Sequence, residues 1–146
     1  MKTTLDMKTI QNMNLFERIT QVKAKSCFDY NIHRVFVVPR KFLKRSLGDN
    51  NKNLPRIEQN IGKKIRIIAE PERNNQEEIQ RFVKAIVFPH EFKRVEITLT
   101  ETHEPEVQVF SLPKNKAILI GRNKQRLIEL SQAIDQFFGI KKVVIK

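Results

Sequence analysis

Apolar residues recur every three or four positions in two stretches of the chain, one near its start and one at its middle. The stretches contain Ile10, Met13, Phe16 and Ile19 in the first half, and Ile79, Phe82, Val83 and Ile86 in the second. This period predicts amphipathic helices. Each helix is followed by two runs rich in β-branched residues, with polar turns between them at 29–31 and at 102–105. Such runs predict a pair of strands in each half.

The two halves match each other when the chain is laid against itself with an offset of 73 residues. Gly48 then falls on Gly121. The strand-like runs also fall on one another, 34–39 on 107–112 and 22–28 on 95–101. Self-similarity at a fixed offset indicates two copies of one structural unit.

The four glycines of the chain take equivalent places in the two copies. Gly62 and Gly139 each follow a helical stretch and precede an apolar run, which is the position of a helix C-terminal glycine. Gly62 lies 14 residues after Gly48, whereas Gly139 lies 18 residues after Gly121. A difference of four residues predicts a helix about one turn longer in the second copy.

Each copy therefore reads α-β-β-α-α-β, with a sheet covered by helices, and the fold class is α+β. The copies span residues 1–73 and 74–146. Each is small for an independent hydrophobic core, so we expect the two to pack together in a fixed orientation.

Net charge narrows the choice of partner. The formal charge is +12, and it is shared as +9 in residues 1–73 (16 Lys and Arg, 7 Asp and Glu) and +3 in residues 74–146 (12 and 9). Such a field favours a polyanion, which is RNA, DNA or an anionic membrane surface. The purely apolar runs are four residues long at most, far short of a membrane span. The alternative is a basic surface that serves no partner.

Several function classes find no support in the residues. Cys27 is the single cysteine, which excludes an internal disulfide and fits a reducing compartment, so we expect a cytoplasmic protein. The histidines at 33, 90 and 103 share neither metal-ligand nor catalytic-triad spacing. The acidic residues form no metal-binding cluster, and no phosphate-binding loop of the Walker type is present. We therefore expect no enzyme activity, no cofactor, no metal and no small-molecule substrate.

The glycines at 48 and 121 lie between predicted helices. A glycine turn that leads into a helix presents backbone amides and the positive end of the helix dipole, a combination that attracts phosphate. Around Gly121 three cations occur within six positions, at Arg122, Lys124 and Arg126. The second turn is therefore a candidate phosphate-binding site.

At this point a family resemblance becomes specific. Residues 15–22, Cys27 and the run 33–38 resemble the start of the archaeal NusA-like transcription factors, and the stretches 48–64 and 121–124 resemble the two glycine loops of that family. The resemblance covers residues 5 to 146. It implies two tandem type II KH domains, over 1–73 and 74–146, that bind single-stranded RNA in transcription termination or antitermination. A KH glycine loop has the form Gly-x-x-Gly and clamps about four nucleotides.

The resemblance and the cations around the two turns together predict the RNA-binding residues. They are Gly121, Arg122, Asn123, Lys124, Gln125 and Arg126 at the second turn, and Lys44, Arg45, Gly48, Asn50, Asn51 and Lys52 at the first. Where the family has its second glycine, this chain has Asn51 and Lys124. Asp49 would repel phosphate, and Pro55 is expected to shorten the following helix. We therefore expect the second turn to be the stronger clamp, with the first adding broad electrostatics.

A second interpretation stays open. The degenerate glycine loops also fit a protein-interaction or assembly scaffold on RNA polymerase or the ribosome, in which RNA contact is secondary. Strong, salt-dependent binding of single-stranded RNA would favour the RNA-binding function over the scaffold function, because each phosphate that the protein neutralises releases counterions.

Overall fold

The computed structural model describes residues 6–146. The chain divides after Glu70 into an N-terminal unit and a C-terminal unit; the sequence repeat placed the boundary after residue 73. Both units have the element order α-β-β-α-α-β, with short 3₁₀ turns between the later helices. The predicted α+β fold class is confirmed, since each unit is a three-stranded sheet with three α-helices.

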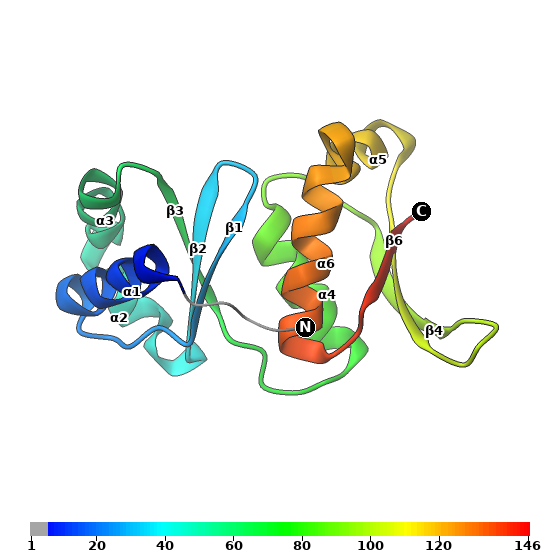
Figure 1. Ribbon diagram of the computed structural model, residues 1–146, viewed down its shortest axis with the longest axis horizontal. Coiled ribbons are helices and arrows are strands. Elements are labelled where there is room, and N and C mark those ends of the chain that lie inside the picture. Colours follow the sequence, from blue (N-terminus) through cyan, green and yellow to red (C-terminus); the bar gives the residue numbers. More distant parts are fainter. Residues whose placement is uncertain (1–5) are drawn as a thin grey trace. The chain divides into compact units, whose positions relative to one another are not determined.

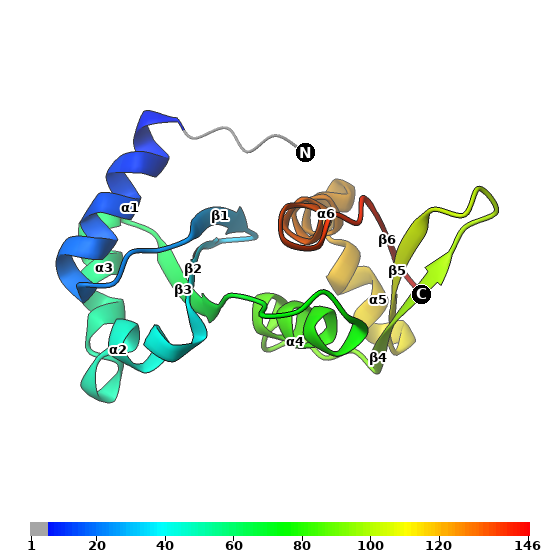
Figure 2. The ribbon, with the colours of Figure 1, turned by 90° about the horizontal axis from the view of Figure 1, so that it is seen from below.

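The N-terminal unit is built around a mixed sheet. Its helices are α1 (Met7–Thr20), α2 (Leu43–Leu47) and α3 (Asn53–Ile61), and its strands are β1 (Ser26–Tyr30), β2 (His33–Val38) and β3 (Lys64–Ala69). The central strand β2 pairs antiparallel with β1 and parallel with β3. Figures 1 and 2 show the three helices together on one side of this sheet.

The core of the N-terminal unit lies between α1 and the sheet. The ring of Phe16 on α1 stacks on the ring of Phe36 on β2, with 4.5 Å between their centroids. Of the predicted helical stripe, Phe16 is buried and Met13 and Ile19 are partly buried against this cluster, whereas Ile10 is exposed. Buried partners in this cluster are Val22, Ala24, Val38, Ile57, Ile65 and Ile67.

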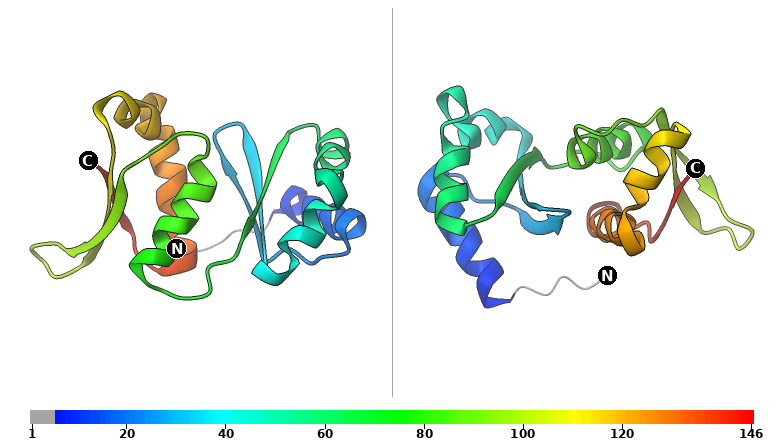
Figure 3. Two further views of the ribbon diagram at one scale, coloured as in Figure 1. Left: turned by 180° about the vertical axis from the view of Figure 1, so that it is seen from behind. Right: turned by 90° about the horizontal axis from the view of Figure 1, so that it is seen from above.

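The C-terminal unit repeats this plan. Its helices are α4 (Gln76–Val87), α5 (Pro113–Ile120) and α6 (Gln125–Phe138), and its strands are β4 (Arg94–Leu99), β5 (Pro105–Phe110) and β6 (Lys142–Ile145). The central strand β5 pairs antiparallel with β4 and parallel with β6. In Figures 1 and 3, α4 and α6 lie side by side next to the sheet. Phe82 of α4 packs against Phe137 and Phe138 of α6.

The predicted helix-ending glycines are confirmed. Gly62 and Gly139 adopt left-handed conformations, and their amides donate to Glu58 and Asp135 in the last turns of α3 and α6. Helix α6 has 14 residues and α3 has nine, so the second helix is the longer one as expected. Pro55 does not delay the start of α3, because it occupies the first turn, where an amide has no intrahelical acceptor.

Two local predictions were wrong. The first hairpin turns at Asn31 and Ile32 rather than over 29–31, because Tyr30 stays in the ladder opposite His33 and Asn31 takes the positive φ that reverses the chain. Residues 22–24 lie before β1 rather than within a strand.

Glu78 lies in the first turn of α4, and its side chain is only 6% exposed. Its carboxylate accepts hydrogen bonds from the amide of Glu72 (2.8 Å) and the guanidinium of Arg81 (2.9 Å). The buried carboxylate therefore binds the backbone of the segment before α4 at Glu72.

Candidate nucleic-acid interface

The two glycine turns have the same backbone conformation. Gly48 has φ 76° and ψ 175°, and Gly121 has φ 77° and ψ 170°. These values lie in a region that only glycine occupies readily. The amide of Gly48 donates to the Lys44 carbonyl, and the amide of Gly121 donates to the Ala117 carbonyl, both at 2.9 Å. Each glycine thus ends one helix and redirects the chain toward the next.

The third and fourth positions of the turns also match. Asn50 has φ 55° and ψ 31°, and Asn123 has φ 55° and ψ 28°. At the fourth position Asn51 has φ 57° and Lys124 has φ 61°. A Gly-x-x-Gly loop has its second glycine at this position, so the left-handed conformation that favours glycine is present without it.

A hydrogen bond closes each four-residue turn. The amides of Asn51 and Lys124 donate to the carbonyls of Gly48 and Gly121, both at 3.1 Å. The fourth residue therefore returns close to the first in both units.

Each turn is supported from behind by the residue five positions after its glycine. Asn53 is 5% exposed, and its Nδ2 donates to the carbonyl of Ser46 at 2.9 Å. In the second unit Nη1 of Arg126 donates to the carbonyl of Ile118, also at 2.9 Å. Both side chains satisfy a carbonyl near the end of the preceding helix, a group that the helix itself leaves without a donor.

The same side chains explain why the first position is glycine. A Cβ atom on Gly48 would lie 2.9 Å from Nδ2 of Asn53, and one on Gly121 would lie 2.8 Å from Cγ of Arg126. Arg126 was predicted to bind RNA, and this stays a prediction: Nη1 of its guanidinium donates to the neutral Ile118 carbonyl, which holds the side chain against the turn while its charge and its other donors remain.

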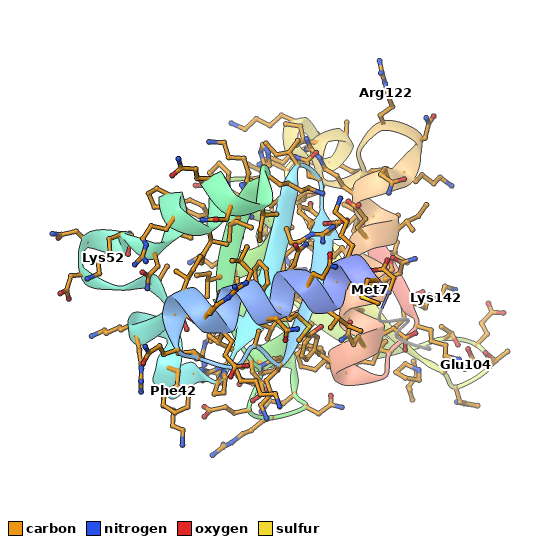
Figure 4. The ribbon with its side chains drawn as sticks, turned by 60° about the vertical axis from the view of Figure 1, so that its left-hand side comes forward. Met7, Phe42, Lys52, Glu104, Arg122 and Lys142 are labelled. Carbon is orange, nitrogen blue, oxygen red and sulfur yellow. The ribbon has the colours of Figure 1, made fainter. Side chains whose placement is uncertain are left out.

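The remaining predicted residues are on the surface. The exposed side chains at the second turn are Arg122, Asn123, Lys124 and Gln125, and those at the first are Lys44, Arg45, Asn50, Asn51 and Lys52. In Figure 4 the side chain of Arg122 points away from its turn, and Lys52 lies on the outer edge of the N-terminal unit. Each turn therefore presents cations to solvent.

The first turn adjoins an open hollow of about 390 Å³. Its lining residues are Ile19, Thr20, Gln21, Lys44, Arg45, Gly48, Asp49, Lys52, Asn53 and Arg56. Four of these are cations and one is an anion, so the hollow suits an anionic ligand. Sequence reasoning missed Asn53 and Arg56. The offset of 73 places Asn53 opposite Arg126 and could have identified the former.

The helices that follow the turns differ at their starts from α1 and α4, and share the lack of a side-chain cap with α2 and α5. Helices α1 and α4 are capped by the side chains of Asp6 and Asn75, which accept from backbone amides in the first turn. Helices α3 and α6 have no side-chain cap. Uncapped helix starts keep amide donors and a positive dipole end that anions can use.

Two other kinds of site find no support in the described part of the chain. Within residues 6–146 no three His, Cys, Asp or Glu side chains are grouped so that they could hold a metal ion. None of the helices over the same range is long and apolar enough to cross a membrane.

Two known proteins are similar to this chain along nearly its whole length, one in sequence and one in structure. No family model matches the chain. Over 143 residues it is 20% identical to a protein of Thermoplasma acidophilum named probable transcription termination protein NusA, covering 98% of this chain and 95% of that one. The crystal structure of a protein named APE1850 aligns with a TM-score of 0.67 at 20% identity, covering 97% of this chain and 99% of that one. The chain therefore shares the APE1850 fold and is similar, at low identity, to a NusA protein along nearly its whole length.

Proposed function

We propose that this chain is a single-stranded RNA-binding protein made of two KH domains of the NusA-like kind, acting in transcription termination or antitermination. The observation that carries the proposal is the matched backbone of the two glycine turns, left-handed at the fourth position in both units. KH domains clamp about four nucleotides with a loop of this kind. The similarity to a protein named for transcription termination supports the biological role.

The proposed mechanism combines the turn with the helix behind it. Phosphates of the strand lie against the turn and the uncapped start of α3 or α6, where amide donors and the helix dipole favour negative charge. Exposed cations next to each turn neutralise the phosphates. This is a binding function, and the absence of enzyme activity and the cytoplasmic location stay predictions.

The relative strength of the two turns also stays a prediction. From the sequence, the second turn is expected to bind RNA more strongly, and Arg122 and Lys124 at this turn are exposed. The hydrogen bond from Arg126 to the Ile118 carbonyl fixes the position of that cation at the second turn and leaves its charge in place. The first turn has four cations around one hollow.

Filter binding of short single-stranded RNAs across a salt series tests the function. Charge reversal of Arg122 and Lys124 to Glu, compared with reversal of Lys44 and Lys52, measures each turn separately. For each phosphate that a variant no longer neutralises, the slope of log affinity against log salt should become shallower by about 0.7.

A matched control reverses Lys8 and Lys141, two exposed cations outside the turns, and changes the net charge by the same amount. The proposal requires both turn variants to bind more weakly than this control. Wild-type binding that vanishes at physiological salt, or equal weakening in all three variants, would favour the scaffold function instead.

A further inference from the structure

A second hollow lies where α4 ends, in the segment 88–93 of the C-terminal unit. It has a volume of about 310 Å³ and is lined by Gln80, Lys84, Phe88, Pro89, His90, Glu91, Phe92 and Lys93. The side chain of Phe88 is 65% exposed. Among the exposed large hydrophobic side chains of residues 6–146 it is the one aromatic ring, and an aromatic ring offers a flat face for stacking.

The segment around this ring is fixed on both sides. The amide of His90 donates to the carbonyl of Val87 at 3.0 Å. Nδ2 of Asn115 on α5 donates to the carbonyl of Glu91 at 3.1 Å, and Oε1 of Gln80 accepts from the amide of Val95 at 2.9 Å. Phe88 is therefore presented by an anchored segment.

The charges around the ring favour an anionic ligand. Lys84 and Lys93 are both exposed, and neither forms an ion pair with another described residue. Glu91 is the one acidic residue of the lining. An apolar ring and two cations that line one hollow suit a nucleobase and its neighbouring phosphates, because base stacking and phosphate neutralisation then act together.

The hollow is also within reach of the second glycine turn. Asn115, which contacts the segment, lies six residues before Gly121 on α5, which is about 9 Å along the helix. Figures 1 and 3 show the C-terminal end of α4 at the same end of the unit as the turn between α5 and α6. A strand that leaves the turn therefore needs only a few nucleotides to reach Phe88.

We propose that Phe88 is a base-stacking platform that binds one unpaired base of the RNA beyond the nucleotides held at the second glycine turn. This inference rests on the proposed RNA-binding function and extends it to a second contact. Lys84 and Lys93 bind the phosphates on either side of that base.

The test uses the full chain and oligoadenylates of four and ten nucleotides. Phe88→Ala should weaken binding of the ten-nucleotide strand by about 5- to 160-fold, and should leave the four-nucleotide strand unaffected because it fills only the turn. Leu99→Ala is the matched control, since Leu99 is 66% exposed on the same unit. It should bind both strands as the wild type does.

Phe88→Trp gives a direct readout, because the chain contains no other tryptophan. A stacked base should quench its emission with the ten-nucleotide strand and not with the four-nucleotide strand. If the chain binds RNA but emission and Phe88→Ala affinity stay unchanged, the platform is refuted while the proposed function stands. If the chain binds neither oligonucleotide, both proposals are refuted. If Phe88→Ala binds a protein partner more weakly but binds RNA as the wild type does, the ring serves protein docking and the platform is refuted.

Discussion

At the fourth position of each turn, two different residues adopt the same left-handed backbone. Asn51 tolerates this conformation better than Lys124, because the short amide side chain can hydrogen-bond locally. The cost of a left-handed backbone for an ordinary residue is about 1–2 kcal/mol, and glycine removes it while adding freedom to the unfolded chain.

Lys124→Gly should therefore stabilise the protein by about 0.5–1 kcal/mol, and Asn51→Gly should stabilise it less. Urea denaturation measures both changes in the free energy of unfolding. Lys124→Ala serves as the control, since it keeps the positive φ and should give no gain. A larger gain for Asn51→Gly than for Lys124→Gly would contradict the explanation.

Cys27 is half-buried, and burial raises the pKa of its thiol to about 12 from an ordinary value of 9.0. Since the thiolate is the reactive form, alkylation of the folded chain at pH 8 should be slower than that of the unfolded chain by about a thousandfold. Mass spectrometry after iodoacetamide treatment, with and without urea, measures this.

The same shift affects stability. The raised pKa gives a stabilising contribution that is complete below pH 9 and is lost as pH rises toward 12, because the unfolded chain ionises first. Cys27→Ala should lack this part of the pH dependence.

In the alkylation experiment, equal rates with and without urea would show that the thiol of the folded chain is accessible and would contradict the raised pKa.

At the scale of elements, the junction between two helices depends on one side chain in each unit. Asn53 is buried and donates to the Ser46 carbonyl, whereas Arg126 makes the equivalent bond to Ile118 at an exposed place. Losing a buried donor leaves its acceptor without a partner, which costs about 1–3 kcal/mol.

We expect Asn53→Ala to lower the free energy of unfolding by about 1–3 kcal/mol, and Arg126→Ala to lower it by less, since water can replace an exposed bond. Chemical denaturation gives both values. Asn60→Ala is the control, because its Nδ2 also donates to a carbonyl, that of Arg56, at an exposed site. A larger loss in the free energy of unfolding for Arg126→Ala than for Asn53→Ala would show that burial does not decide how much each hydrogen bond contributes.

The sequence predicted the elements better than their connections. Helix periods and the paired glycines located the helices, the sheets and both turns, because those signals are local. The hairpin at Asn31 was misplaced, because strand pairing extends through Tyr30 and decides where the chain reverses. The engagement of Arg126 was missed, since it depends on the angle between α5 and α6. The hollow at Phe88 could not be predicted, because it depends on the hydrogen bond between Asn115 and the Glu91 carbonyl, and hydrophobic periodicity carries no information on contacts between distant residues.

At the scale of the whole molecule, net charge and the number of turns together set the salt dependence of binding. Four phosphates at each of two turns, at about 0.7 per phosphate, give a slope of about −5.6, whereas one working turn gives about −2.8. Titrations with a polyadenylate long enough to contact both turns, between about 50 and 300 mM salt, distinguish these values. A slope near zero would mean that phosphates do not contribute, despite the charge of +12.

The missing second glycine has a consequence for the entropy of association. Asn51 and Lys124 reach fewer backbone conformations than glycine, so ordering a turn that contains them removes less conformational entropy, while each adds the strain of its left-handed backbone. Less freedom is then lost when the strand docks, and preorganised receptors of this kind tend to retain a ligand longer. Asn51 and Lys124, which replace the second glycine of the loop, can in this way lower the entropy that the loop loses when it binds a strand.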